Sequence, residues 1–430
     1  MLDIKFIRDN PDIVKKAVKN KKANVDVDEL LEIDKKRRQL MESSEALKAE
    51  QNSRSKGPQS SESIAELKKL KEKFKELEDG LTEIEHRFHE LMLKVPNIPS
   101  EDTPIGSDES GNKIIRQVGK ISKFSFKPKE HWELGQDLDI LDTERAAKVS
   151  GTRFVYMKGG LALMEFALMQ YGLSVLTDKK KLAQIAQKNK LDVPDTPFVP
   201  ILPPVFIKPD VFQKMGRLEP KEERYHIQSD DLYLIGSAEH TLGSMHMDEF
   251  LGIESLPLRY VGFSTAFRRE AGSYGKDTKG MLRIHQFDKL EMESFTLPED
   301  STKEQDFIVA IQEYMMQELE LPYQVVAICT GDMGAPDSRQ IDIETWMPGQ
   351  NKYRETHTSD LMTDFQSRRL GIRFKRDNKS EFVHMNDATA FAGRTLIAIM
   401  ENYQTEKGTI VVPKVLQKYI GGLKEIKHGR

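Results

Sequence analysis

The feature that most constrains this chain is a seven-residue repeat of apolar side chains between residues 62 and 95. One heptad position holds Leu67, Phe74, Leu81, Phe88 and Val95, and another holds Leu70, Leu77, Ile84 and Leu91. Apolar side chains at this spacing form one narrow stripe along a helix, which is the pattern of a coiled-coil seam. A long helix with only one such stripe needs a partner helix and otherwise faces water.

A second charge-rich helical pattern, residues 27–52, precedes the first and carries Ile33, Leu40 and Leu47 at heptad spacing. Between the two patterns lies "NSRSKGPQSSES", which is rich in turn-forming residues and cannot continue a helix. The two patterns therefore predict an antiparallel helical hairpin, a coiled-coil arm of about residues 27–95 inside an N-terminal domain of residues 1–100.

Length and composition narrow the class of protein. A chain of 430 residues predicts two or three units, and an apolar fraction of 38% with a net charge of −4 is typical of a soluble globular protein. The single cysteine, Cys329, excludes a disulfide framework and a thiolate zinc site. The start "MLDIKFIRDNP" has no apolar signal region, and no run of residues suggests a membrane span, so we expect a cytoplasmic protein with no membrane partner.

Beyond a linker rich in Pro, Gly and acidic residues (96–113), the remaining chain is predicted to form one unit, residues 101–430. Strands are expected at 232–236, 259–269, 281–295, 324–329 and 340–347, and helices at about 159–171, 177–190, 301–319 and 394–403. Most of these strands are separated by turns instead of crossover helices, which predicts a largely antiparallel sheet.

The stretch "FRREAGSYGKDTKGMLRIHQFDKLEMESF", residues 267–295, indicates a hairpin with a charged face. If residues 281–295 form a strand, one face carries Arg283, His285, Phe287, Lys289 and Glu291. Arg268 and Glu270 share a face at the end of the preceding segment. Such a row suits an extended anion with a flat base, because guanidinium groups bind phosphates and an aromatic ring stacks. The alternative is a solvated hairpin face, and the loop lacks the spacing of a P-loop.

Two further segments favour the anion site. "AFAGRTLIAIMENY" sets Gly393 and Arg394 at the start of a helix, where an arginine opposes the helix dipole and a bound phosphate would relieve that repulsion. Asp342 and Glu344 in "QIDIETWMPG", followed by Glu355, are candidate Mg²⁺ ligands because this cation prefers oxygen ligands and shares them with phosphates.

These residues carry a resemblance to a known family. "FRREAGSYGKDTKGMLRIHQFDKLE" (motif 2, about 267–291) and "GRTLIAIMENYQ" (within motif 3, about 384–403) resemble signature motifs of the class II aminoacyl-tRNA synthetases. "FVPILPPVF" (about 198–206) resembles motif 1, which lies at the dimer interface in that class. Further pieces along the chain, including "LPYQVVAICTGDMG" and "DFQSRR", resemble the seryl-tRNA synthetase family. The resemblance implies an α+β fold: an antiparallel β-sheet catalytic domain flanked by helices, an N-terminal antiparallel coiled-coil arm, and a homodimer.

The resemblance also implies an ATP-dependent ligase that forms seryl-adenylate and pyrophosphate and then transfers serine to the 3′ end of tRNA(Ser), with tRNA(Sec) left open as a further substrate. Arg268, Arg283 and Arg394 would be the catalytic cations on the phosphates. Phe287 and Glu270 would hold the adenine. No general base is needed, because the attacking carboxylate is already ionised and fixed cations with Mg²⁺ lower the barrier.

The same resemblance also implies which residues bind the metal and which bind the serine. Glu355 and Thr358 would coordinate Mg²⁺. The serine-binding residues would be Ser237, Glu239, Arg268 and Glu291, together with a residue before motif 3. The family's "TAE" element reads "SAE" here, and its "HTLNGS" element is replaced in "HMNDATAFAGR". Counting back from Arg394 selects Asn386 for that last residue, whereas aligning "DAT" with "NAT" selects Asp387, so both stay candidates.

In the seryl family the helical arm grips the tRNA, so basic residues of this arm become candidate phosphate contacts. They are Arg54, Lys56, Lys68, Lys69, Lys71 and Lys73. No DNA partner is expected. Two alternatives remain from other classes: an amino-acid:carrier-protein ligase, whose members resemble the catalytic core but lack such an arm, and a non-catalytic tRNA-binding homologue.

Overall fold

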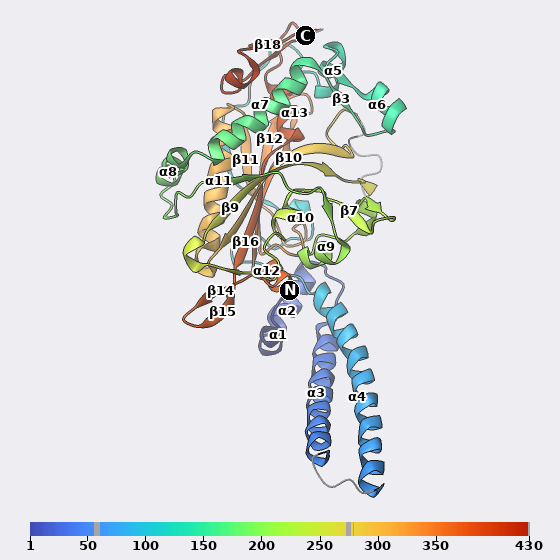
Figure 1. The fold of residues 1–430 in the computed structure, drawn as a ribbon. Helices are drawn as coiled ribbons and strands as arrows, with labels where there is room; N and C mark the ends of the chain where they lie inside the picture. Colours follow the sequence, from blue (N-terminus) through green and yellow to red (C-terminus); the bar gives the residue numbers. More distant parts are fainter. Residues whose placement is uncertain (56–60, 272–276, 278, 429–430) are drawn as a thin grey trace. The chain divides into compact units, whose positions relative to one another are not determined.

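The computed structural model describes residues 1–55, 61–271, 277 and 279–428 (Figure 1). It divides into two compact units, Met1–Ile98 and Pro99–Arg430. Helices and strands are both present in the second unit, so the predicted α+β class is confirmed. Much of the expected linker belongs to the second unit: the Thr103 hydroxyl, for example, donates a hydrogen bond to the carbonyl oxygen of Ser338 at 3.1 Å.

The first unit contains α1 (Ile4–Asp9), α2 (Pro11–Asn20), α3 (Val27–Arg54) and α4 (Ser61–Lys94). Helices α3 and α4 lie side by side as the predicted hairpin (Figure 1). Asp26 begins α3 by accepting hydrogen bonds from the backbone N–H groups of Asp28 and Glu29 at 2.8 and 3.2 Å, which satisfies donors that the first helical turn leaves unpaired.

The seam of the hairpin follows the heptad pattern. The heptad side chains of α4 are half-buried and the positions between them are mostly exposed. This is the burial expected for two helices that cover only one stripe of each other. Across the seam, the Arg37 guanidinium lies 4.9 Å from the ring centre of Phe88, and Arg87 donates to Glu29 at 3.0 Å. Near the tip of the hairpin, Arg54 donates to Glu66 at 2.8 Å.

The second unit is built on one large sheet. Its strands in spatial order are β1 (Lys113–Val118), β11 (Tyr323–Ala327), β12 (Arg339–Met347), β13 (Lys352–Thr363), β16 (His384–Ala392), β10 (Gln286–Thr296), β9 (Leu258–Phe267) and β4 (Val199–Ile201). Neighbours pair antiparallel except β4, which runs parallel to β9. The predicted antiparallel sheet is therefore confirmed, with one parallel strand at its edge.

Short strands form smaller sheets around the main one. They are β2 (Leu141–Asp142) with β3 (Tyr156–Met157), β5 (Phe206–Ile207) with β7 (Leu232–Leu234) and β6 (His226–Ile227), β8 (Phe250–Leu251) with β14 (Arg373–Arg376) and β15 (Lys379–Phe382), and β17 (Ile410–Val411) with β18 (Glu425–Ile426). The helices are α5 (His131–Asp137), α6 (Thr143–Ser150), α7 (Gly159–Leu176), α8 (Lys179–Lys188), α9 (Pro209–Met215), α10 (Glu239–Leu242), α11 (Ser301–Glu318), α12 (Phe365–Leu370) and α13 (Gly393–Asn402).

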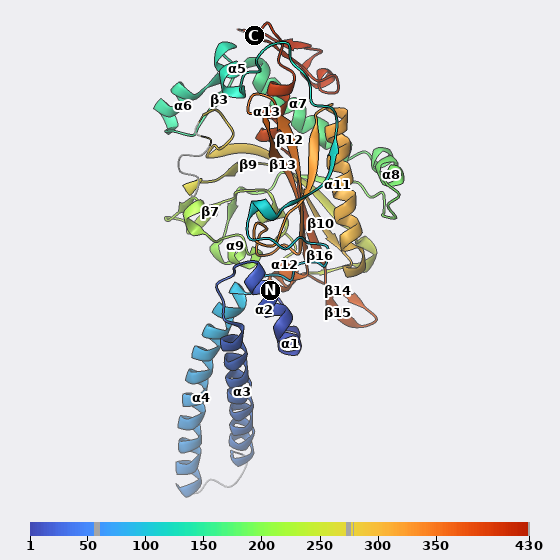
Figure 2. The same cartoon turned by 180° about the vertical axis from the view of Figure 1, so that it is seen from behind.

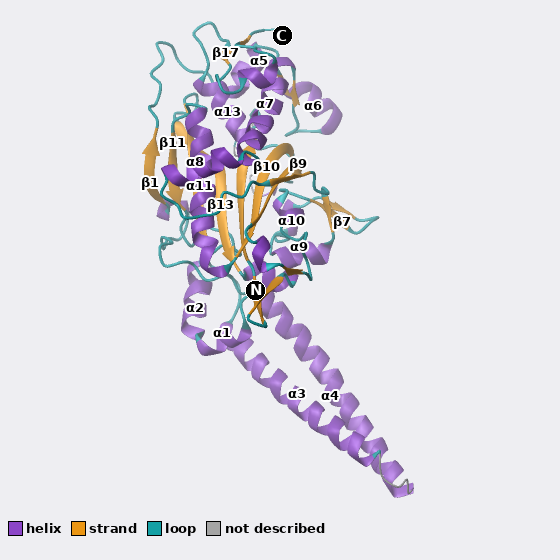
Figure 3. Cartoon of the chain, turned by 60° about the vertical axis from the view of Figure 1, so that its left-hand side comes forward, coloured by secondary structure: helices purple, strands orange, loops and turns teal. Residues whose placement is uncertain are grey.

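Helices α7, α11 and α13 pack on one face of the main sheet, and α11 lies alongside the strands in two further views (Figures 2 and 3). Leu290 and Met292 of β10, with Ala388 and Ala390 of β16, belong to the apolar core between these helices and the sheet. The alternate residues of the same strands point to the other face, because side chains alternate along a strand. That other face carries the polar groups described below.

One strand predicted for this unit needs correction, and two of its central strands were not predicted. The stretch 281–295 is not one strand: β10 begins at Gln286. The chain before it bonds elsewhere, since Met281 N–H donates to the His131 ring and His285 N–H to the Arg153 carbonyl. Strands β13 and β16 were not predicted, although both are central. Their sequences mix apolar, charged and small residues on two buried faces, so the alternation that marks a half-buried strand is missing.

Helix α7 is long and apolar enough in composition to cross a membrane, with a mean hydropathy of 1.3, which the sequence analysis did not foresee. Most of its apolar side chains pack in the core, where Leu161, Met164 and Leu168 are fully buried, whereas Leu163 and Phe166 are 49% and 58% exposed. Gly172 allows the helix close to the sheet, because a Cβ there would lie 2.6 Å from Leu290 Cδ2. The apolar composition of α7 therefore matches its position against the sheet.

Glu165 of α7 yields a pH-dependent prediction. This side chain is 3% exposed and its Oε2 has no hydrogen-bond partner among the described residues. Burial, assisted by the charge of Asp288, raises the pKa of Glu165 to about 8. A carboxyl group with a raised pKa stabilises the fold at low pH, and this contribution is lost as the pH rises toward 8. We expect Glu165→Gln to flatten the fall in unfolding free energy between pH 5 and pH 8 by up to about 1.4 kcal/mol per pH unit.

Urea unfolding of both proteins at half-unit pH steps measures this slope. Glu406→Gln, an exposed carboxylate, is the matched control and should leave the slope unchanged. Equal slopes for wild type and Glu165→Gln would show that Glu165 does not hold its proton in the folded state.

Candidate functional site

A cavity of about 510 Å³ lies on the face of the main sheet opposite α7, α11 and α13. Strands β10, β13 and β16, the end of β9, the start of α13 and the segment entering α10 contribute its walls. The predicted site residues that line it are Ser237, Glu239, Arg268, Glu270, Arg283, Phe287, Glu291, Glu355, Thr358, Asp387 and Arg394. Residues more than 150 positions apart in the sequence are thus brought around one space.

Arg268 follows directly after β9 and is held from two sides. Its Nε donates to the carbonyl oxygen of Gly236 at 3.1 Å, and its guanidinium lies 5.4 Å from the ring centre of Phe287. A cation at this distance from an aromatic ring is attracted to the ring face. Arg268 and Phe287 therefore support each other, which leaves a charged group and a flat apolar surface adjacent in the cavity.

Arg283 is paired with acidic residues of its own hairpin. It donates to Glu270 at 3.3 Å and to Asp277 at 3.2 Å, and Asp277 also binds Arg354. Partial burial would raise the pKa of Asp277, but the guanidinium groups of Arg354 and Arg283 hold it below its ordinary value. The Arg283 side chain is therefore oriented, and its charge is balanced, by acidic residues of the protein itself.

Arg394 stands at the start of α13, as predicted, and faces Glu355 of β13. It donates to Glu355 Oε2 at 3.2 Å and to the Glu355 carbonyl oxygen at 3.1 Å. The Glu355 side chain is 49% exposed; desolvation by the cavity wall opposes its ionisation, but Arg394 and then Arg268 keep its pKa below its ordinary value. Thr358 Oγ1 lies 3.5 Å from Glu355 Oε1, so a carboxylate and a hydroxyl oxygen stand together at the cavity wall. Such an oxygen pair is the donor set that Mg²⁺ prefers.

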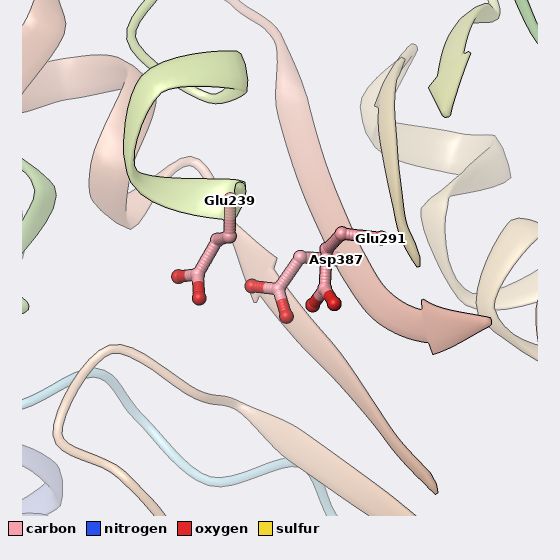
Figure 4. A group of neighbouring side chains, drawn as sticks. All are labelled: Glu239, Glu291 and Asp387. Carbon is pink, nitrogen blue, oxygen red and sulfur yellow. The ribbon is translucent and has the colours of Figure 1, made fainter. Parts of the chain in front are cut away.

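At the other end of the cavity three carboxylates point toward a common space (Figure 4). Glu239 comes from α10, Glu291 from β10 and Asp387 from β16, and one oxygen of each lies within 4.8 Å of the others. Lys289 Nζ lies 2.7 Å from Glu291 Oε2 and donates to Ser237 Oγ at 3.3 Å. The end of the cavity is therefore acidic, with one lysine bound along its side.

A cation that the sequence analysis missed organises this acidic end. Arg217 contacts four carboxylates: Nε donates to Glu239 at 2.6 Å, and Nη2 donates to Asp337 at 3.1 Å, Asp360 at 3.2 Å and Asp387 at 3.3 Å. Arg217 follows Gly216, which ends α9 with a left-handed backbone (φ +74°). It lies outside every motif, and only the tertiary fold brings its four partners together.

Carboxyl groups that contact Arg217 have pKa values shifted in opposite directions. Burial would raise the pKa of Glu239, but Arg217 at 2.6 Å holds it below its ordinary value. Burial raises the pKa of Asp387 and of Asp360 well above the ordinary range, and neighbouring carboxylates add to both shifts. Glu239 is therefore ionised at neutral pH, whereas burial favours the protonated form of Asp360 and of Asp387.

The structure distinguishes Asn386 from Asp387, the two candidates for the last serine-binding residue. Asp387 lines the cavity, paired across the strands with Glu293 of β10. Asn386 is not brought to the cavity: it is fully buried, and its amide nitrogen and oxygen have no hydrogen-bond partner among the described residues. Neighbouring residues of a strand face opposite sides, so only one of the two could point into the site.

The predicted phosphate contacts of the arm lie on its surface. Lys68, Lys69, Lys71 and Lys73 are exposed on α4. Arg54 is paired with Glu50 and Glu66, at 2.7 and 2.8 Å. Lys56 lies outside the described residues.

The comparisons with known proteins agree with this geometry. Two family profiles match: "tRNA synthetase class II core domain (G, H, P, S and T)" over residues 223–403 and "Seryl-tRNA synthetase N-terminal domain" over residues 1–99. The sheet, its cavity and these matches are those of a class II aminoacyl-tRNA synthetase. The chain is 41% identical to a serine–tRNA ligase of Symbiobacterium thermophilum, over 97% of this chain and 98% of that protein, and 39% identical to one of Citrifermentans bemidjiense, over 99% and 100%. It belongs to the seryl-tRNA synthetase family.

Solved structures give the same result. Seryl-tRNA synthetase from Pyrococcus horikoshii, complexed with ATP, superposes with a TM-score of 0.89 at 37% identity and covers 100% of both chains. Cytoplasmic serine–tRNA ligase from Naegleria fowleri, in complex with AMP, superposes with a TM-score of 0.85 at 31% identity, covering 100% of this chain and 99% of that one. The predicted family and fold are confirmed.

Arg217→Met tests the acidic end of the cavity. The variant leaves four buried carboxylates without their guanidinium, so we expect it to lower the unfolding free energy by about 3–5 kcal/mol at pH 8. In the wild type, the lowered pKa of Glu239 contributes stability above about pH 4 that is lost only on further acidification. In the variant the pKa of Glu239 rises, so the deficit should shrink from pH 8 to pH 5 as protons replace the missing cation.

Urea unfolding at both pH values measures the deficit. Arg217→Lys is the matched variant: it keeps the charge but cannot span four carboxylates, so it should recover only part of the loss. A deficit of the same size at pH 5 and pH 8 would assign the loss to packing and not to charge.

Proposed function

We propose that this protein activates L-serine with ATP and transfers the serine to the 3′ end of tRNA(Ser). The observation that carries the proposal is one cavity that brings together Arg268, Arg283 and Arg394, an aromatic platform and an acidic amino-acid end. The two solved relatives with ATP and AMP, at 37% and 31% identity over nearly complete chains, support a nucleotide in this cavity. The match of residues 1–99 to the seryl-tRNA synthetase N-terminal domain disfavours a carrier-protein ligase that lacks an arm.

In this proposal the nucleotide takes the arginine-lined part of the cavity. Phe287 stacks on the adenine and Glu270 contacts the base. Arg268 holds the α-phosphate and the serine carboxylate, while Arg283 and Arg394 hold the outer phosphates. The attack of the serine carboxylate oxygen on the α-phosphorus builds negative charge, and cations already fixed by protein contacts stabilise that charge without further reorganisation.

Mg²⁺ fits the same site. Glu355 and Thr358 would hold it, because their oxygen atoms are adjacent and Arg394 beside them is suited to the phosphates the metal would share. When bound, the ion supplies positive charge to the phosphate oxygens. The role of Arg394 is to orient Glu355 and to face the outer phosphates.

For the amino acid we propose Ser237, Glu239, Glu291 and Asp387 as the binding residues besides Arg268. The lowered pKa of Glu239 keeps it ionised, which suits an α-ammonium group. Lys289 bridges Glu291 and Ser237 and so orients both. Asn386 has no part in this proposal, because it does not line the cavity.

The remaining parts of the proposal concern partners and location. The exposed lysines of α4 and Arg54 would contact phosphates of tRNA(Ser), with tRNA(Sec) as a further candidate. Around the segment resembling motif 1, Val199, Leu202 and Phe206 are 54%, 83% and 45% exposed. Such apolar exposure supports an interface with a second copy of the chain. The cytoplasm is the proposed location.

Arg283→Ala and Lys69→Ala separate the two halves of the reaction. Serine-dependent exchange of pyrophosphate into ATP should fall by about 10²–10³-fold in Arg283→Ala, the typical loss when one group that stabilises developing charge is removed. Lys69→Ala should exchange like the wild type but charge tRNA(Ser) less well, most clearly at low salt, because a lost phosphate contact also reduces the salt dependence of binding.

Arg283→Lys serves as the matched variant and should retain part of the exchange, because it keeps the charge without the planar fork. Equal loss of exchange in Arg283→Ala and Lys69→Ala would contradict the assignment. Absence of exchange with serine in the wild type would overturn the proposed function itself.

A further inference from the structure

The amino-acid end of the cavity carries more negative than positive side chains. Its buried carboxylates are Glu239, Glu291, Glu293, Asp337, Asp360 and Asp387. The cations that touch them are Arg217 and Lys289. Arg224 and Arg268 also line the cavity, but they donate to the carbonyl oxygens of Arg217 and Gly236. Serine would add one ammonium, and the six carboxylates still outnumber the cations described in contact with them, a buried surplus that is costly unless protons or a further cation neutralise it.

One of these carboxylates, Glu293, lacks a hydrogen-bond partner at both oxygens among the described residues, and Asp360 lacks one at a single oxygen. Both oxygens of Glu293 and the Oδ1 of Asp360 are buried and unpaired. Glu293 lies two residues beyond Glu291 on β10, so the two share a strand face, and it pairs across the strands with Asp387. Burial raises the pKa of Glu293 well above its ordinary value, with the charges of Glu239 and Glu291 adding to the shift. Unpaired buried acceptors of this kind call for a donor.

The spacing of the carboxylates suits an ammonium group. One oxygen of each of Glu239, Glu291 and Asp387 lies within 4.8 Å of the others, so a point exists that is at most about 2.8 Å from all three, within reach of a charge-assisted N–H···O bond. An ammonium group has three donors to give, whereas the serine hydroxyl has one. The Nε and Nη2 of Arg217 and the Nζ of Lys289 already contact carboxylates or Ser237. The site thus offers acceptors for two ammonium groups, and serine brings one.

We propose that this site takes a small amino acid with a second ammonium group, L-2,3-diaminopropionate, in which an ammonium stands where serine has its hydroxyl. The inference rests on the proposed function, because the reaction is the same. A carboxylate oxygen of the substrate bonds to the α-phosphorus of ATP, the bond from that phosphorus to the bridging oxygen breaks, and pyrophosphate leaves. No oxidation or reduction occurs, and the second ammonium keeps its proton and pairs with the carboxylates of β10, β13 and β16.

The test is pyrophosphate exchange by the full-length protein with L-serine, L-2,3-diaminopropionate and L-alanine. Alanine has the same backbone with neither hydroxyl nor ammonium. We expect kcat/KM for diaminopropionate to equal or exceed that for serine, and to exceed that for alanine by at least about tenfold, the ratio that one hydrogen bond to a charged group supplies.

Two isosteric variants locate the effect. Asp387→Asn and Glu293→Gln each remove a charge at nearly constant shape, and each should lower the diaminopropionate-to-serine ratio of kcat/KM by about tenfold or more. Glu406→Gln, an exposed carboxylate of the same unit, is the matched control and should leave the ratio unchanged.

The outcomes are distinguishable. If pyrophosphate exchange occurs with serine, but diaminopropionate is no better a substrate than alanine, the inference is overturned and the proposed function stands. A diaminopropionate-to-serine ratio unchanged in both variants also overturns it. Exchange with none of the three amino acids overturns the proposed function and the inference together. Because either variant can fail to fold, the wild-type comparison decides by itself.

Discussion

The structure depends on strand β10, which has two different faces and pairs on both sides. Leu290 and Met292 point into the core under α7, α11 and α13, while Lys289, Glu291 and Glu293 occupy the opposite face. The ladder to β9 and to β16 satisfies the backbone groups of the strand, so charged side chains can be buried on one face without opening the sheet. A slip of one residue would exchange the two faces, and the apolar core therefore fixes the register of the chemical groups as well.

Charge placement on that face follows from how each cation is held. Arg268 is fixed by a carbonyl oxygen and an aromatic ring, Arg394 by Glu355, and Arg217 by four carboxylates. The first two sit where a nucleotide phosphate would gain from them, and the third sits where it holds acids in place. One cavity thus contains a cationic part and an acidic part, a division suited to joining an anionic and an ammonium-bearing reactant.

Much of this arrangement was predictable from the sequence. The heptad repeat predicted α3 and α4 within a few residues, and the motif resemblance named eleven of the residues that line the cavity. The prediction failed where the local sequence carries no recognisable pattern. Arg217 lies in a loop after α9 with partners 22 to 170 residues away, and β13 and β16 are buried on both faces. The alternatives Asn386 and Asp387 differ only in register, which depends on the pairing of β16 with β10 and not on local sequence.

Under the proposed function, in which Arg283 holds an outer phosphate of ATP, its pairing with Glu270 and Asp277 has a consequence for the energetics of nucleotide binding. A phosphate reaching Arg283 does not meet a hydrated cation; it displaces carboxylates that already satisfy the guanidinium. Binding then becomes an exchange of anions around a fixed centre, in which the released acids return to water. Such an exchange moderates the affinity for the polyphosphate and lets the same acids reclaim the arginine when pyrophosphate departs, which favours turnover over tight retention of the product.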